Sequence, residues 1–170
     1  VSVDGLYVYN AGDDSIDTDQ GYVGTLSNVY AEQNVVDDET GSRVIEADSH
    51  STSEAGTPVA KPTLVNAILK SKGRAIRLRE GTGYVFNNVQ VTVESSSDAS
   101  VAAIRVSDTG ITGAEINTAG AGLAIKNKVD GTKNFHDAAT EAVFTGTNAP
   151  VFIDDDTSLT ITAYDASWAM

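Results

Sequence analysis

The sequence predicts a mostly β protein, an antiparallel β-sandwich or jelly roll with one short helix near residues 63–72 and a long irregular N-terminal arm. Three observations predict it. Short runs alternate apolar and polar residues, turn-forming segments separate these runs at intervals of about ten residues, and the helices of ten or more residues that a doubly wound sheet needs between its strands are missing. We expect residues 1–60 to form the acidic strands and arm and residues 61–170 the sandwich core, within one domain overall.

The N-terminal segment combines a strand signal with long polar stretches. Residues 1–9 alternate around Gly5 and predict a short strand with Tyr7 and Tyr9 on one side. Residues 11–21 form a polar turn rich in carboxylates, and scattered apolar residues predict one or two strands before position 36. Residues 37–61 are rich in Ser, Thr, Glu, Asp and Gly, which favours an exposed loop or arm.

The segment from Lys61 to Glu80 predicts a change of structural period. Leu64, Val65, Ile68 and Leu69 share one helical face, Pro62 suits a first helical turn and Gly73 a helix end, which predicts the short helix. After Gly73 the period becomes two. We expect Arg77 and Arg79 to point outward from a strand whose other face is buried.

The C-terminal half carries the strongest strand signals. Alternation over residues 89–93 and 101–106, joined by a polar turn, predicts a β-hairpin. Asp130-Gly131 predicts a further turn. The remaining predicted strands are 111–116, 123–129, 141–145, 151–153 and 158–164, with a loop or one helical turn at 135–140.

Composition excludes several functional classes. A formal charge of −13 repels nucleic-acid backbones and anionic membranes. The chain has no cysteine, which excludes disulfides, thiolate metal sites and cysteine catalysis. No apolar run is long enough to span a bilayer. Val1 in the first position is what removal of an initiator Met or cleavage of a leader leaves behind.

Catalytic motifs are absent from the sequence. His50 lies in Asp-Ser-His-Ser and His136 precedes Asp137, but neighbours in a loop lack the fixed geometry of a catalytic triad. The glycine pairs at Gly81-Thr-Gly83 and Gly120-Ala-Gly122 lack the third glycine of a dinucleotide-binding loop. We therefore expect no enzymatic activity and no cofactor.

Two groups of aspartates are candidate calcium ligands. Carboxylate oxygens are the hard ligands that Ca²⁺ prefers, although the spacing does not match an EF-hand. Solvated acidic turns are the alternative explanation. The candidate ligands are Asp13, Asp17, Asp19, Asp154 and Asp156.

One basic segment in an acidic chain suggests a contact surface. Residues 61–80 hold six of the eleven basic residues, and they can meet the acidic surface of a neighbouring subunit or pair with the acidic N-terminal half of their own chain. Several tyrosines gather in the first thirty residues, and core packing or an interface anchor explains them better than a platform for a sugar ligand. The candidate partner-binding residues are Lys70, Lys72, Arg74, Arg77, Arg79, Tyr7 and Tyr9.

The runs VQVTVESSSDASVAAIRVSDTGITG, AGLAIKNKVDGT and APVFIDDDTSLTITAYDASW resemble the sandwich or jelly-roll structural proteins of tailed bacterial and archaeal viruses. The resemblance covers about residues 74–168 and transfers no site residues. It implies a non-enzymatic subunit of the virion that decorates the capsid, self-associates and binds the major capsid protein. The alternative is a secreted filament or surface-layer subunit at the cell surface, assembled by β-strand exchange.

Overall fold

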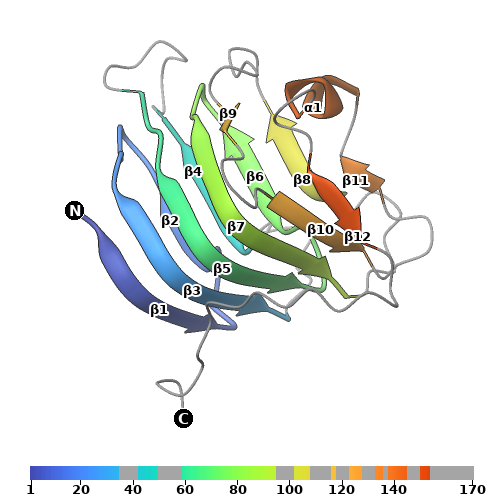
Figure 1. Ribbon diagram of the computed structural model, residues 1–170, viewed down its shortest axis with the longest axis horizontal. Coiled ribbons are helices and arrows are strands. Elements are labelled where there is room, and N and C mark those ends of the chain that lie inside the picture. The colour runs from blue at the N-terminus through green and yellow to red at the C-terminus, as the bar shows by residue number, and fades with distance from the viewer. Residues whose placement is uncertain are drawn as a thin grey trace.

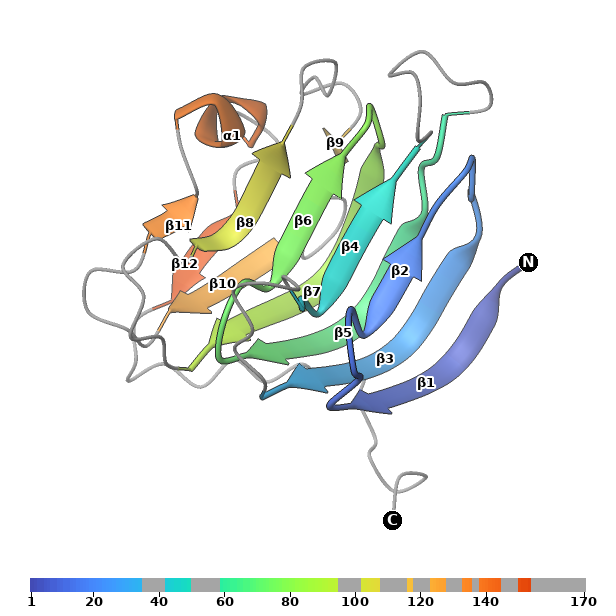
Figure 2. The same cartoon turned by 180° about the vertical axis from the view of Figure 1, so that it is seen from behind.

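The computed structural model describes residues 1–34, 42–49, 59–94, 102–107, 116–117, 123–127, 133–135, 138–144 and 150–153. These residues form two β-sheets that face each other across an apolar core (Figures 1 and 2). The chain passes from one sheet to the other and back in successive coils, and each coil lies on the one before it. Every strand pairing in both sheets is parallel.

The larger sheet, sheet A, has the strand order β1-β3-β5-β7-β10-β12, with β9 also paired to β7. Its strands are β1 (Val3–Tyr9), β3 (Thr25–Gln33), β5 (Thr63–Ser71), β7 (Tyr84–Val93), β9 (Ile116–Asn117), β10 (Leu123–Asn127) and β12 (Val151–Ile153). The second sheet, sheet B, has the order β11-β8-β6-β4-β2. Its strands are β2 (Ile16–Thr18), β4 (Ile45–Asp48), β6 (Ile76–Arg79), β8 (Ala102–Ser107) and β11 (Lys133–Phe135).

The prediction of an antiparallel sandwich or jelly roll was wrong. Residues 89–93 and 102–106 do form strands, but they belong to different sheets and do not form the predicted hairpin. The long N-terminal irregular arm was wrong as well, because β4 lies within the segment 37–61 that was predicted as an arm and β2 within the predicted turn at 11–21, and both strands belong to sheet B. Strands were predicted where β1, β3, β6, β7, β8, β10 and β12 lie, but β2, β4 and β5 were predicted as a turn, an arm and a helix, and the predicted strand pairing was wrong.

A residue with positive φ interrupts each of the first strands of sheet A at the same register position. The φ angle is 76° at Gly5, 53° at Asn28 and Asn66, and 57° at Asn88. Glycine and asparagine tolerate this left-handed conformation better than other residues. The asparagine side chains also bond to one another across the coils: Asn88 Nδ2 donates to Asn66 Oδ1 (2.9 Å), and Asn66 Nδ2 to Asn28 Oδ1 (3.4 Å). We call these stacked side chains the asparagine ladder.

This left-handed residue explains why residues 63–72 were wrongly predicted to be a helix. In β5, Leu64 points inward before the bend and Ala67 and Leu69 point inward after it. The residue at the bend inserts one extra position into the alternation of inward and outward side chains. Leu64 and Ala67 therefore face the same side although they are three residues apart, and not two. A spacing of three followed by two mimics helical periodicity, although the segment is extended throughout.

Inward side chains stack in rows along the axis of the coils. In sheet B, Ile16, Ile45, Ile76 and Ile104 occupy equivalent positions, and the last three are fully buried. In sheet A, the buried rings of Tyr84 and Phe86 stack with their centroids 4.7 Å apart. Burying these rows removes apolar surface from water, which is the main force that holds consecutive coils together.

A short helix, α1 (Ala138–Val143), packs beside β8 and β11. Thr140 Oγ1 accepts a hydrogen bond from the Val106 amide (3.1 Å) and donates one to the Val106 carbonyl (3.3 Å). The sequence predicted a strand from residue 141, so this part of the prediction was wrong. In the part of the chain that the structure describes, no helix is both long enough and apolar enough to cross a membrane.

Replacing the central asparagine of the ladder should destabilise the fold. Asn66→Ala removes hydrogen bonds to Asn28 and Asn88 and forces alanine into the left-handed conformation, so the free energy of unfolding should fall by about 2 to 4 kcal/mol. Asn66→Gly loses the same bonds without the conformational penalty and should cost about half as much. Urea denaturation of both variants measures the difference, and equal losses would show that backbone conformation contributes nothing at this position.

Candidate functional site

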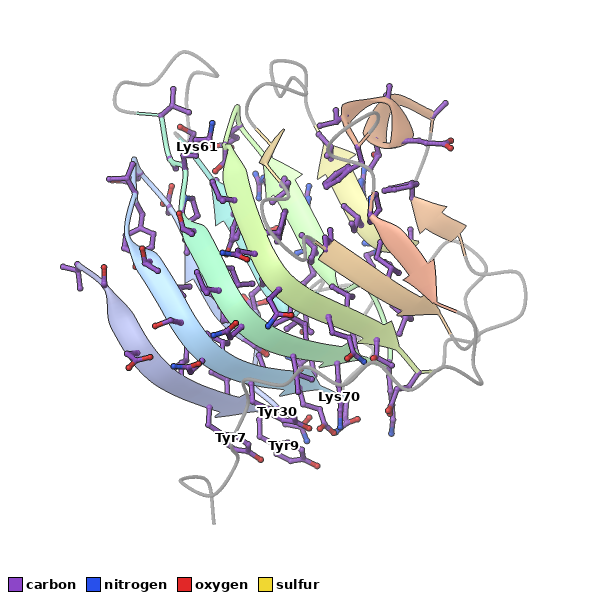
Figure 3. All side chains as sticks on the ribbon, in the orientation of Figure 1. Tyr7, Tyr9, Tyr30, Lys61 and Lys70 are labelled. Atoms are coloured by element: carbon purple, nitrogen blue, oxygen red, sulfur yellow. The ribbon has the colours of Figure 1, made fainter. Side chains whose placement is uncertain are left out.

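Exposed tyrosines mark the outer face of sheet A near its N-terminal end. Tyr7 and Tyr30 lie side by side in adjacent coils, and their rings stack with centroids 5.2 Å apart and planes 10° apart. Tyr9, two residues further along β1, lies beside Glu32. Tyr7 is 48% exposed and Tyr9 54% exposed, and both point away from the body of the protein (Figure 3).

Polar groups border these rings and are held in place by one another. Glu32 accepts hydrogen bonds from the Tyr30 hydroxyl and, at 2.7 Å, from Asn34 Nδ2. Asn34 Nδ2 also lies 3.4 Å from the Tyr9 hydroxyl oxygen, to which it donates. Lys70 Nζ is 4.0 Å from Glu32 Oε2 and 5.2 Å from the centroid of the Tyr30 ring. We call Tyr7, Tyr9, Tyr30, Glu32, Asn34 and Lys70 the tyrosine patch.

The hydrogen bonds of the patch fix the charge state of its carboxylate. Donation from the Tyr30 hydroxyl, and secondarily from Asn34, lowers the pKa of Glu32 despite partial burial. Burial, and then the hydrogen bond to Glu32, raises the pKa of Tyr30. At neutral pH the patch therefore presents the ionised Glu32 carboxylate beside the neutral Tyr30 phenol.

A second group of charges lies on the outer face of sheet B. Glu46 accepts hydrogen bonds from Arg43 Nη1 (2.9 Å) and Arg77 Nη1 (3.1 Å), and its other oxygen is 3.6 Å from Arg79 Nη1. Arg79 Nε is in turn 3.2 Å from Asp48 Oδ1. Arginines of one coil are thus paired with carboxylates of the neighbouring coil. We call Asp14, Arg43, Glu46, Asp48, Arg77 and Arg79 the charge cluster.

Burial dominates the electrostatics of the charge cluster. The Asp14 side chain is only 7% exposed and accepts a hydrogen bond from the Arg43 amide at 2.6 Å. Burial and the nearby Glu46 carboxylate nevertheless raise the pKa of Asp14 to about 7. Burial also raises the pKa of Asp48 to about 6, although the Arg79 guanidinium opposes the shift. Burial likewise lowers the pKa of Arg43.

The structure divides the predicted partner-binding residues between the two sheets. Tyr7, Tyr9 and Lys70 come together in the tyrosine patch, whereas Arg77 and Arg79 pair with Glu46 and Asp48 of their own chain. Those two ion pairs are the intramolecular alternative that the sequence had left open. The other two basic residues are placed by their backbones: the Lys72 amide donates to the Gln33 carbonyl (3.1 Å), and the Arg74 carbonyl accepts from Ser71 Oγ (3.1 Å).

The predicted calcium ligands are only partly within the described residues. Asp13, Asp17 and Asp19 lie on or beside β2, and among the residues that the structure describes no three His, Asp or Glu side chains are grouped so that they could hold a metal ion. Asp154 and Asp156 lie outside the described residues, as do His50 and His136.

Sequence reasoning missed Tyr30, Glu32 and Asn34. The sequence does contain a signal for them, a short repeat. Each copy begins with glycine or asparagine, and apolar residues follow at its second and fourth positions. The four copies are residues 5–9, 28–32, 66–70 and 88–92. Such a repeat predicts stacked, equivalent strands. Aligning the first two segments places Tyr7 on Tyr30 and Tyr9 on Glu32, as the structure does.

Parallel coils that stack two facing sheets along one axis define a parallel β-helix. The chain belongs to the pectate-lyase-like β-helix family, whose domain model matches residues 1–168. No curated protein and no solved structure was found to match it. The family includes enzymes, and membership does not by itself show that this chain lacks activity.

The family overturns the resemblance to virion proteins. That resemblance rested on the rhythm of short strands, which a parallel β-helix shares with a sandwich because both alternate inward and outward residues along each strand. The parallel pairing of both sheets and the match over residues 1–168 show that the sandwich and jelly-roll assignments were wrong. Strand rhythm alone does not separate the two architectures.

The raised pKa values in the charge cluster predict a pH-dependent stability. The folded-state pKa values of Asp14 and Asp48 exceed the ordinary value of 3.8, so between about pH 4 and pH 7 the folded state binds more protons than the unfolded state. The contribution of these groups to stability should therefore fall as the pH rises through this window. Asp14→Asn should flatten the fall and be more stable than the parent protein at pH 8.

Thermal unfolding between pH 4 and pH 8 measures this effect. Glu141→Gln, which changes an exposed acid on α1, is the matched control and should leave the pH profile unchanged. If Asp14→Asn instead lowers the melting temperature at pH 8, the Asp14–Arg43 pair is stabilising and burial does not dominate.

Proposed function

We propose that this chain is a glycan-binding β-helix that recognises a neutral polysaccharide through the tyrosine patch without cleaving it. The observation that carries the proposal is the pair of exposed tyrosines, Tyr7 and Tyr9, on strand β1 beside an anchored carboxylate and amide. Aromatic rings offer apolar faces to the C–H groups of a sugar ring. Carboxylate and amide groups offer acceptors and donors to its hydroxyls.

Rigidity favours this surface as a binding site. Tyr7 and Tyr30 are held by β1 and β3, which are paired along their length, and each ring supports the other by stacking. Side chains that are already ordered lose little conformational entropy when a ligand binds. Glu32 is fixed by two donors, so its position does not depend on the ligand.

Charge favours a neutral glycan over an anionic one. Glu32 is ionised because its pKa is lowered, and the chain as a whole carries a formal charge of −13. A polyuronate would approach against this field, whereas an uncharged polysaccharide would not. Lys70 contributes one positive charge to the patch, and it already lies 4.0 Å from Glu32.

The composition of the patch favours binding over hydrolysis. Glycoside hydrolases typically use a pair of carboxyl groups on either side of the scissile bond. The tyrosine patch as defined contains one carboxylate, Glu32, and that carboxylate is tied to Tyr30 and Asn34. Such a group can accept hydrogen bonds from a sugar, but it is poorly suited to act as a proton donor at neutral pH.

Removing the exposed rings should abolish most of the binding. Tyr7→Ala and Tyr9→Ala should each weaken binding to a neutral β-glucan, laminarin, by about tenfold, since each loses a stacking surface worth roughly 1 kcal/mol or more. Val23→Ala, which truncates a residue 64% exposed at the same end of the protein but outside the patch, is the matched control. Isothermal titration calorimetry measures the affinities, with polygalacturonate as the anionic comparator.

Three results would contradict the proposal. Binding of polygalacturonate in preference to laminarin and every other neutral glycan tested would reverse the expected charge selectivity. Equal binding by Tyr7→Ala and the parent protein would remove the patch from the site. Shorter oligosaccharides appearing in the reaction mixture would show that the chain cleaves its ligand.

A further inference from the structure

Asp4 and Gly5 form an aspartyl-glycyl pair at the bend of β1, which lies beside β3 (Figure 1). The Asp4 side chain is exposed, and the φ angle of Gly5 is 76°. The strand register pairs Asp4 with Ser27 of β3 and resumes at Leu6, after the glycine. Among the described residues, no atom beyond the two chain neighbours lies within 4 Å of the place that a Cβ on Gly5 would take, which leaves space beside this backbone.

An aspartyl-glycyl pair can close into a five-membered ring, a succinimide. The amide nitrogen of the glycine attacks Cγ of the aspartate, so a C–N bond forms and a C–O bond breaks. The departing oxygen leaves as water, with the amide proton and the proton of the carboxylic acid. Addition of water to the ring then breaks one of its two C–N bonds and gives either aspartate or isoaspartate. Glycine favours ring closure because it has no side chain to hinder the nitrogen.

The Asp4 carboxylate lies beside the amide that this reaction needs. The Gly5 amide donates a hydrogen bond to it, which brings the nitrogen next to the carboxyl group that it would attack. Two side chains of β3 bind the same carboxylate: Ser27 Oγ and Asn28 Nδ2 each donate to Asp4 Oδ1 at 2.7 Å. Asn28 belongs to the asparagine ladder, so the ladder ends on this carboxylate.

The two donors from β3 keep the carboxylate in its unreactive form. The hydrogen bond from Ser27, and then the one from Asn28, lower the pKa of Asp4. Ring closure needs the carboxylic acid, because the ionised group lacks the proton with which its oxygen departs as water. Turning Cγ toward the Gly5 nitrogen would also break both hydrogen bonds, which is costly when the acceptor is charged.

We propose that Asp4–Gly5 is a site of spontaneous isoaspartate formation, which the hydrogen bonds from Ser27 and Asn28 suppress. The loss of either donor, or the separation of β1 from β3, frees the carboxyl group and allows the ring to close. The reaction needs water alone as a reagent, and it leaves the mass of the chain unchanged.

This conversion alters the strand that carries the exposed tyrosines. An isoaspartate leads the main chain through Cβ and Cγ, so it inserts one atom into the backbone of β1. The inserted atom precedes Leu6, whose pairing with Val29 belongs to the register of the rest of the strand. Tyr7 therefore shifts relative to Tyr30, with which it stacks at a centroid distance of 5.2 Å.

Ageing of the purified full chain tests the proposal. The protein is incubated for several weeks at physiological temperature and neutral pH, then unfolded and digested with endoproteinase Asp-N, which cleaves before aspartate but not before isoaspartate. Mass spectrometry with electron-transfer fragmentation measures the fraction of isoaspartate at residue 4. We expect slow conversion in the parent protein. Ser27→Ala and Asn28→Gly should each convert about threefold faster, because each lacks one donor to the carboxylate.

Two variants separate protection by these donors from overall stability. Asn66→Gly loses ladder bonds and is destabilised, but both donors to Asp4 remain, so it should convert at the parent rate. Asp4→Glu keeps a carboxylate but would need a larger ring, and it should show no conversion at this position. Peptide mapping separates this pair from Asp130–Gly131, which lies outside the described residues.

Several outcomes would overturn the proposal. One is the absence of isoaspartate at residue 4 from the parent protein, Ser27→Ala and Asn28→Gly alike, and another is equal rates in all three. Acceleration in Asn66→Gly as large as in Ser27→Ala would show that unfolding sets the rate. Unchanged amide exchange over Val3–Tyr9 after ageing would contradict the shift of β1. No glycan enters these measurements, so this site and the tyrosine patch can fail separately.

Discussion

The left-handed residue in β1, β3, β5 and β7 of sheet A is the constraint on which the architecture depends. This residue bends the strand and shifts by one position the alternation of inward and outward side chains. Asn28, Asn66 and Asn88 adopt the left-handed conformation that the bend requires, and their side-chain amides hydrogen-bond to one another. Without this bend, the residues on one side of it would face solvent where they now face the core. The same bend sets which side of β1 and β3 carries the tyrosines, so the tyrosine patch depends on a backbone conformation several residues away.

The two sheets use their outer faces differently. Sheet A presents stacked tyrosine rings and carboxylates held by hydrogen bonds from neighbouring side chains, whereas sheet B pairs arginines with carboxylates between coils. Partly buried ion pairs of this kind give little net stability, because the cost of removing the charges from water offsets most of their attraction. These ion pairs instead favour one alignment of the strands, because Glu46 lies beside Arg77 only in the observed register of β4 and β6.

The sequence predicted features that depend on neighbouring residues better than features that depend on residues far apart in the chain. Alternation within one strand is local, so β1, β6, β7, β8, β10 and β12 were anticipated within a few residues. The partner of each strand is a distant segment: Leu64 pairs with Phe86, 22 positions later, but Leu26 pairs with Leu64, 38 positions later. Because the separation between equivalent strands varies, the repeat is hard to recognise in the sequence. The bend at Asn66 also gives β5 a spacing of apolar residues that resembles that of a helix. Tyr7, Tyr9 and Lys70 were predicted as candidate partner-binding residues from the tyrosine cluster and the basic segment, but their proximity to Glu32 and Asn34 depends on the register between strands, which the sequence pattern did not supply.

The isoleucines of sheet B have a consequence for how this molecule can change in size. Ile16, Ile45, Ile76 and Ile104 occupy the same register position in successive strands of sheet B. Equivalent positions recur at the spacing of neighbouring strands, about 4.8 Å. Duplicating one coil would therefore lengthen the body by one such step and leave the interior of the others intact.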